Sequence, residues 1–215
     1  MGRIGDWINR QRHNRGYGVQ SPSSFFFVTQ VLKERLPYYA YPTLEAIAEE
    51  EGYPTKRVKE LFRIANHHVP ANCIAIGSPV IACAMATARA SAATYCIPCT
   101  APTEKAKSLL DKYGCKVLDS DIQKAFVTLL DEVKEIGMLY IGNIAQRYKL
   151  LETAIRYTNG NSLIVIDDIH STPITEQWWQ TLIDNPATIV TYDMYSYGLL
   201  YFNKERIKQH YTLKR

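Results

Sequence analysis

Short apolar runs alternate along the chain with longer stretches in which apolar residues recur every three or four positions. The longer stretches are typical of amphipathic helices, and the short runs are typical of buried strands. Seven runs predict strands, at residues 73–77, 93–97, 116–118, 138–141, 162–166, 187–192 and 198–202. The first five alternate with predicted helices, which indicates a parallel α/β sheet with right-handed crossovers. The last two predict a closing antiparallel pair.

The first third of the chain predicts helices alone. Ser21 and Pro22 form a helix-start signal, with serine as N-cap and proline in the first turn. That helix is expected to end at residues 36–37, and further helices follow up to residue 68. We therefore expect an N-terminal helical cap over residues 1–69 and an α/β domain over residues 70–215, together one compact unit.

Composition narrows the class of protein. With 215 residues and an apolar fraction of 47%, the chain suits one globular domain with a large core. No apolar run reaches membrane-spanning length, and the first residues lack the apolar core of a secretory signal. We therefore expect a cytoplasmic protein with no membrane partner. Five cysteines favour reduced thiols over a disulfide framework.

The net charge of +4 includes a basic start, with four arginines in the first fifteen residues. Such an arm can contact phosphate or RNA. Because the rest of the chain mixes both signs evenly and carries no RNA-binding signature, a solvated basic start to a helix is favoured. Nucleic acid is not expected as a partner.

The stretch from Leu61 to Ala90 predicts a helix, a buried strand that ends at Gly77, a tight turn and a second helix. The small residues of the second helix would allow it to pack closely on the sheet. A strand that ends in glycine and turns into a helix is where α/β folds bind nucleotide-like ligands. The turn after Gly77 is therefore the first candidate site.

This stretch resembles motif I of class I S-adenosylmethionine-dependent methyltransferases. From about residue 16 onward, the chain resembles small bacterial O-methyltransferase-like proteins. The resemblance is also carried by Gly18–Pro22, Leu163–His170, Gly198–Phe202 and Lys208–Leu213. It implies a Rossmann-like methyltransferase fold with a mostly parallel seven-stranded sheet, a C-terminal antiparallel hairpin and an N-terminal helical cap.

The resemblance implies S-adenosylmethionine as cofactor and suggests its contacts. Gly77 and Ser78 would lie at the cofactor, with Ile97 at the end of the second strand and Asn143 after the fourth. The chain departs from the family pattern at three acidic positions and one glycine. Ala75 and Ile81 stand where motif I has an acidic residue and its second glycine, and the ends of strands two and four lack their carboxylates. The cofactor motif is therefore degenerate.

Asp167, Asp168 and His170 follow the fifth predicted strand and match the family pattern. By resemblance they are the catalytic candidates at the acceptor. Two adjacent carboxylates and a histidine at a strand end suit general-base work or metal ligation, with Asp167 and Asp168 as ligands of a divalent cation. The alternative is structural, with Asp168 capping the next turn and His170 filling a pocket.

Three functions stay open. The first is a small-molecule O-methyltransferase, and the second is a non-catalytic binding or assembly protein that keeps the methyltransferase fold. The third is a thiol or metal protein, because Cys96 and Cys99 have redox-motif spacing and Cys83 is expected nearby. Small apolar residues at strand ends are the structural alternative for these cysteines. A homo-oligomer also stays open, with Trp178 and Trp179 as interface anchors or as ordinary packing residues.

Overall fold

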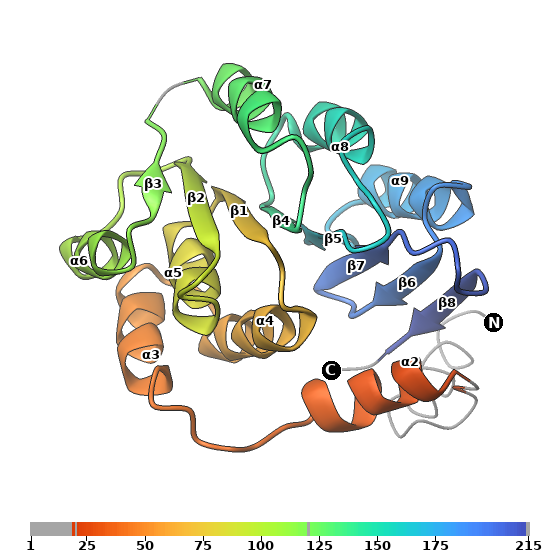
Figure 1. The fold of residues 1–215 in the computed structure, drawn as a ribbon, viewed down its shortest axis with the longest axis horizontal. Coiled ribbons are helices and arrows are strands. Elements are labelled where there is room, and N and C mark those ends of the chain that lie inside the picture. Colours follow the sequence, from red (N-terminus) through yellow and green to blue (C-terminus); the bar gives the residue numbers. More distant parts are fainter. Residues whose placement is uncertain (1–18, 20, 120, 214–215) are drawn as a thin grey trace.

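A computed structural model describes residues 19, 21–119 and 121–213. Its centre is an eight-stranded sheet in the order β3-β2-β1-β4-β5-β7-β6-β8 (Figure 1). The strands are β1 (Asn72–Gly77), β2 (Ala93–Pro98), β3 (Lys116–Val117), β4 (Met138–Ile141), β5 (Leu163–Asp167), β6 (Val190–Asp193), β7 (Tyr197–Tyr201) and β8 (Gln209–Thr212). The first five run parallel, and β7 is antiparallel to both β5 and β6. The predicted α/β class and the closing antiparallel pair are confirmed.

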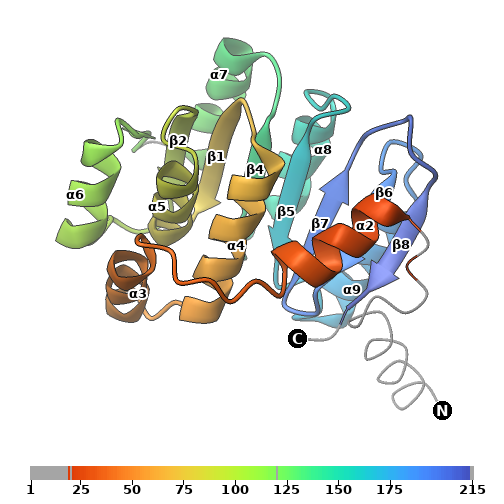
Figure 2. The ribbon, with the colours of Figure 1, turned by 60° about the horizontal axis from the view of Figure 1, so that its bottom comes forward.

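Helices cover both faces of this sheet (Figure 2). They are α2 (Pro22–Phe26), η1 (Phe27–Val31), α3 (Tyr41–Glu50), α4 (Thr55–His68), α5 (Pro79–Ala88), α6 (Glu104–Lys112), α7 (Ile122–Val133), α8 (Arg147–Ile155) and α9 (Pro173–Asp184). Residues of η1 and of α3 to α6 share one buried cluster with the sheet, and residues of α7, α8 and α9 share the other. None of the helices within the described residues is long and apolar enough to cross a membrane.

The strands divide their side chains between these two clusters. In β1, Cys73 and Ala75 face the cluster of α4 and α5, whereas Ile74 and Ile76 face the cluster of α7 and α8. Side chains alternate along a strand with a period of two, so a continuous apolar run serves both faces. Helix α5 is buried along nearly its whole length, and its alanines at positions 82, 84, 86 and 88 allow close packing.

The cap is part of the same core. Buried residues of α4, including Leu61 and Ile64, belong to one cluster with residues of β1 and β4. The arginine Arg63, also on α4, donates from Nε to the carbonyl of Val31 and from Nη2 to that of Leu32, each over 3.0 Å. The cap therefore packs on the sheet through apolar side chains, and Arg63 joins its first helical segment to α4.

Two predictions need correction. The first helix does not reach residues 36–37, because it widens into a π-helical turn and ends at Val31, where Arg63 takes the carbonyl groups that a longer helix would use. The sheet has eight strands, not seven. The missed strand, β8, is short and polar, and it forms by pairing parallel to β6 rather than from an apolar run of its own.

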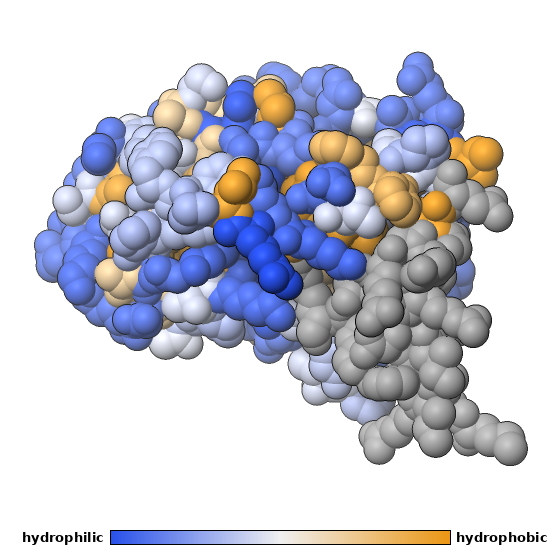
Figure 3. All heavy atoms as spheres, turned by 90° about the horizontal axis from the view of Figure 1, so that it is seen from below, coloured by the Kyte–Doolittle hydropathy of each residue, from blue (hydrophilic) through white to orange (hydrophobic). Residues whose placement is uncertain are grey.

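The molecular surface is mostly hydrophilic on the face drawn in Figure 3, with single apolar residues scattered over it. Such scatter is ordinary for a protein surface. Phe25 and Phe26 on α2 are about half exposed, at 47% and 51%. Of the predicted tryptophan pair, Trp179 is buried and Trp178 packs against Tyr148 with ring centroids 4.4 Å apart. Trp179 is thus a core residue, and Trp178 is a half-buried residue packed on Tyr148.

We expect Gly198→Ala to lower the free energy of unfolding by about 1–3 kcal/mol, the range for overpacking a core. A Cβ at Gly198 would lie 2.4 Å from Cη2 of the Trp179 ring, which is 2% exposed and has little room to move. Urea unfolding followed by tryptophan fluorescence measures the change. Gly160→Ala is the matched control, because the nearest atom to its added Cβ is 3.8 Å away. Equal stability of the two variants would contradict the prediction.

Candidate functional site

The carboxyl ends of β1, β2, β4 and β5 meet at one edge of the sheet, which we call the strand-end site. Gly77 closes β1 with a φ of 97°. A Cβ there would lie 3.3 Å from Cγ2 of Ile144 and 3.7 Å from Sγ of Cys99. The backbone conformation and the close neighbours both favour glycine. The side chains of Ile144 and Cys99 thus lie against the turn at which the sequence predicted the cofactor.

The other predicted cofactor contacts have different surroundings. Ser78 lies half-buried in the same turn, directly before α5. Ile97 is fully buried and packs in the cluster on the α7 side of the sheet. Asn143 is exposed, and its Nδ2 donates to Oδ2 of Asp168 over 3.2 Å. The structure therefore places Gly77 and Ser78 at the turn, joins Asn143 to the acidic pair, and assigns Ile97 to the core.

Asp167 ends β5 with its carboxylate turned into the protein. Its side chain is 7% exposed and forms an ion pair with Arg57 of α4. The Tyr140 hydroxyl of β4 donates to Oδ2 of Asp167 over 2.9 Å, and the Tyr53 hydroxyl reaches the same oxygen over 3.3 Å. The two phenol oxygens lie 2.8 Å apart. One carboxylate thus joins the cap, β4 and β5.

Burial raises the pKa of Asp167, and the charge of Arg57 opposes that rise. Burial likewise raises the pKa of both Tyr53 and Tyr140. Burial alone would lower the pKa of Arg57, but the carboxylate beside it raises that pKa overall. The phenols therefore stay protonated as donors and the guanidinium stays charged.

Asp168 begins the turn after β5 with a φ of 48°, an uncommon conformation for a residue other than glycine that aspartate tolerates better than most. Its side chain is 38% exposed, and its Oδ1 lies 3.8 Å from Nη1 of Arg57. Its backbone N–H donates to the carbonyl of Ser196 over 2.8 Å. Asp168 thus combines a role in the turn with a carboxylate at the surface of the site.

His170 bridges to the hairpin rather than to Asp167. Its Nε2 lies 2.8 Å from Oδ2 of Asp193 at the end of β6, and its Nδ1 lies 3.2 Å from Oε1 of Glu176 in α9. Its ring stacks on Tyr195 with centroids 5.5 Å apart. These contacts agree with the structural alternative for His170, in which the ring fills a pocket beside the turn.

A second buried arginine holds the strand-end site from the other side of the sheet. Arg147, in the first turn of α8, donates from Nη1 to the backbone carbonyl of Asp167 over 3.2 Å. Its Nη2 donates to Oγ1 of Thr175 over 2.8 Å and reaches Oγ of Ser171 over 3.4 Å. Sequence reasoning missed both Arg57 and Arg147. Neither arginine belongs to a motif, and each meets Asp167 only through tertiary packing.

Comparison with known proteins gives structural neighbours only. No protein-family model and no curated protein sequence matches the chain. The solved structures include a Staphylococcus aureus protein assigned by name as a caffeoyl-CoA O-methyltransferase, with 14% identity over 77% of this chain and 93% of that one and a TM-score of 0.63. An O-methyltransferase from Bacillus cereus in complex with SAH shares 11% identity over 81% and 95% of the two chains, with a TM-score of 0.61. An SAH-bound methyltransferase from Podospora anserina shares 13% identity over 90% and 96%, with a TM-score of 0.61.

The chain has the methyltransferase fold. At these identities the likeness establishes the architecture that the sequence resemblance implied, including the mostly parallel sheet with its antiparallel end. The chemistry of the site has to be argued from the residues themselves, because a fold hosts more than one function.

The predicted divalent cation does not fit the side chains of this methyltransferase fold. No group of three or more histidine, cysteine, aspartate and glutamate side chains within the described residues could hold a metal ion. The guanidinium of Arg57 contacts Asp167 and also lies near Asp168. A positive charge from the protein already stands between the two carboxylates that the sequence proposed as ligands.

The cysteines of the third hypothesis are free thiols. Cys83 and Cys96 are buried, Cys99 is exposed, and burial raises the pKa of all three. Reactive and metal-binding cysteines need the opposite shift, towards the thiolate. The surroundings of these residues therefore agree with the structural alternative for the Cys96–Cys99 spacing.

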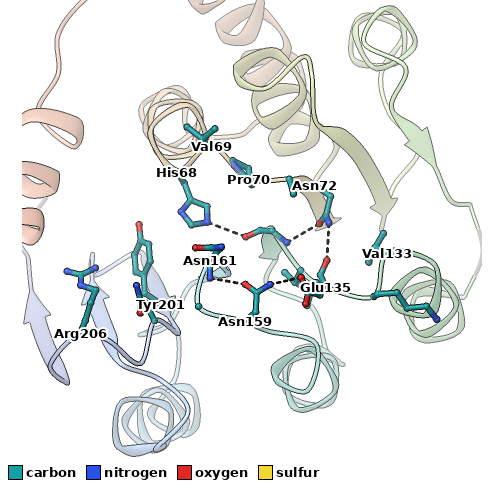
Figure 4. Close-up of a pocket in the computed structure, with 16 residues that line it drawn as sticks. His68, Val69, Pro70, Asn72, Val133, Glu135, Asn159, Asn161, Tyr201 and Arg206 are labelled. Carbon is teal, nitrogen blue, oxygen red and sulfur yellow. Dashed lines mark hydrogen bonds between the residues drawn. The ribbon is translucent and has the colours of Figure 1, made fainter.

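A cavity of about 640 Å³ lies at the opposite end of the sheet, where β1, β4 and β5 begin (Figure 4). The polar groups that line it hydrogen-bond to one another. Asn72 accepts from the Gly137 N–H over 3.1 Å and donates to the Glu135 carbonyl over 2.9 Å. Asn159 donates to Oε2 of Glu135 over 2.6 Å, and His68 Nε2 lies 3.3 Å from the Gly137 carbonyl. This cavity is remote from the strand-end site, and its polar groups hold strand starts together.

We expect Arg147→Met to lower the free energy of unfolding by about 2–3 kcal/mol, because the Asp167 carbonyl and the Thr175 hydroxyl would stay buried without their charged donor, and a buried group left unsatisfied costs about 1–3 kcal/mol. Arg147 is 5% exposed, whereas Arg156, one residue beyond the end of α8, is exposed. Chemical denaturation of both variants makes the comparison. Arg156→Met should stay within about 0.5 kcal/mol of wild type, as surface substitutions do. A loss of stability as large in the Arg156 variant would show that the buried contacts are not the cause.

We expect Cys96 and Cys99 to react slowly with iodoacetamide near neutral pH, and the rate at Cys99 to keep rising above pH 9. The raised pKa leaves less thiolate at a given pH than free cysteine has, and the thiolate is the nucleophile. Mass spectrometry of the alkylated peptides over a pH series gives the rate at each thiol. A rate that levels off below pH 7 at either cysteine would revive the thiol hypothesis.

Proposed function

We propose that the chain is a relative of the S-adenosylmethionine-dependent O-methyltransferases with an eroded cofactor site, and that it works as a non-catalytic binding or assembly protein. The observation that carries this proposal is the turn at Gly77, where Ile144 and Cys99 lie against the glycine. Methyl transfer needs above all a shaped site that presents the cofactor to its acceptor. A turn lined by Ile144 and Cys99 is poorly suited to form such a site.

The residues around the turn fit the cofactor badly. Fully buried Ala75 and Ile81 replace an acidic residue and a glycine of the family motif, and β2 ends in Ile97 and Pro98 without a carboxylate for the ribose. A hydrogen bond to a charged group contributes about 1.5–3 kcal/mol. Each such loss weakens binding about tenfold to a hundredfold. Ile81 and Ile97 are fully buried, so they contribute to packing and not to binding of the cofactor.

An active small-molecule O-methyltransferase is the second candidate. It is favoured by the acidic pair Asp167–Asp168, which keeps its place at the end of β5 beside the Gly77 turn. In that case S-adenosylmethionine would bind at Gly77, Ser78 and Asn143, and the acceptor would lie near Asp168. A homo-oligomer and a cytoplasmic location are part of both proposals.

Calorimetric titration with S-adenosylmethionine, and separately with S-adenosylhomocysteine, tests the choice. We expect no saturable binding at micromolar ligand, because the charged grip on the ribose is missing. Binding in the micromolar range would contradict the eroded site and favour the active enzyme.

Two variants show which site is responsible for any heat of binding that is observed. Asn143→Ala should weaken binding that occurs at the strand-end site, whereas Asn203→Ala, in the wall of the remote cavity, should leave it unchanged. The reverse pattern would place the ligand in the cavity at the strand starts. It would overturn both candidate functions, because each assigns ligand binding to the strand-end site.

A further inference from the structure

Both carboxylate oxygens of Asp167 have donors from this chain. Its Oδ1 accepts from Nη1 of Arg57, and its Oδ2 has the hydroxyls of Tyr140 at 2.9 Å and Tyr53 at 3.3 Å. The carboxylate is 7% exposed and the Arg57 side chain 15% exposed. Both oxygens are thus occupied inside the protein, where partners are not readily exchanged for water.

Asp168 also has a donor from this chain near each carboxylate oxygen, although it lies nearer the surface. Nη1 of Arg57 lies 3.8 Å from its Oδ1, and Nδ2 of Asn143 donates to its Oδ2 over 3.2 Å. Each of the four oxygens in the acidic pair therefore faces a donor from the protein. The same guanidinium nitrogen lies near both carboxylates.

The position of Arg57 is fixed by its neighbours. It lies in the first turn of α4, and its guanidinium carbon is 5.6 Å from the centroid of the Tyr53 ring, within the range of a cation–π contact. Tyr53 in turn reaches Asp167. Arginine carries its charge at every physiological pH, so it permanently offsets one of the two negative charges of the pair.

A divalent cation would need the carboxylate oxygens that Arg57 already faces. Such ions bind carboxylate oxygens that are free to coordinate. They would also be repelled by a guanidinium a few ångströms away, and that repulsion is strong in a poorly solvated site. Cation and Arg57 are alternatives for the same two carboxylates.

We propose that Arg57 takes the place of a divalent cation at the end of β5, so that Asp167 and Asp168 bind the cap to the sheet instead of a metal. The substitution is made within one chain, by an arginine of the N-terminal cap and two aspartates of the α/β domain. The inference does not depend on whether S-adenosylmethionine binds, and its test uses no cofactor.

The test compares Mn²⁺ binding to wild type and Arg57→Gln, measured as loss of the free Mn²⁺ signal in electron paramagnetic resonance. We expect no binding by wild type at millimolar Mn²⁺ and one new site in Arg57→Gln. The variant should lose roughly 10 °C in Tm, since one partner of a buried ion pair is removed, and Mn²⁺ should restore part of the loss. Adding Asp167→Asn to Arg57→Gln should abolish the new site.

Two variants separate charge from position. Arg57→Lys keeps a cation at the pair and should bind no Mn²⁺. Lys59→Ala removes a cation from the same helix, but its ion pair with Glu45 is about one-third exposed, so it should change neither Tm nor Mn²⁺ binding appreciably.

The proposal is overturned if wild type binds Mn²⁺ and Asp167→Asn abolishes that binding, or if Arg57→Gln gains no site. Should Arg57→Gln fail to fold in the absence of metal, its refolding yield with and without Mn²⁺ replaces the binding measurement. Recovery of the folded protein by the cation would support the exchange, and equal yields would contradict it.

Discussion

The ion pair between partly buried Arg57 and buried Asp167 is the contact on which the strand-end site depends. Removing two charges from water is costly, and the cost is offset only when geometry is good and the remaining lone pairs are satisfied. Here Tyr53 and Tyr140 supply the further hydrogen bonds. Loss of either charged partner would strand the other, at a cost of about 3–5 kcal/mol. The cap and the sheet are thus held together at the place where this fold otherwise performs its chemistry.

Other features of the site are arranged around that pair. Arg147 takes the backbone carbonyl of Asp167 from the α8 side, so the end of β5 is fixed from both faces of the sheet. Asp168 then leaves the strand in a left-handed turn and meets Asn143. At the end of β1, two strands away from β5 in the sheet, Ile144 and Cys99 lie against Gly77. The polar groups at this end of the sheet have partners within the chain, and Ile144 and Cys99 lie against the Gly77 turn.

The methyltransferase fold does not depend on the residues of the strand-end site. The sheet is specified by runs such as Met138–Ile141 and Leu163–Asp167, which supply side chains to both helical layers. Cofactor-gripping residues lie at strand ends and in turns, where replacement costs little packing. Erosion of a site and retention of its frame are therefore physically compatible.

The sequence by itself determined the order of strands and helices, the glycine turn after β1 and the acidic pair after β5. These features are local, since they depend on periodicity, on backbone conformation and on residues a few positions apart. It did not reveal β8, which exists only through its pairing with β6. Nor did it reveal that Arg57 would meet Asp167, a residue 110 positions away. Only the tertiary structure decided the state of the acidic pair, because the charge and hydration of a carboxylate depend on what the folded chain brings beside it.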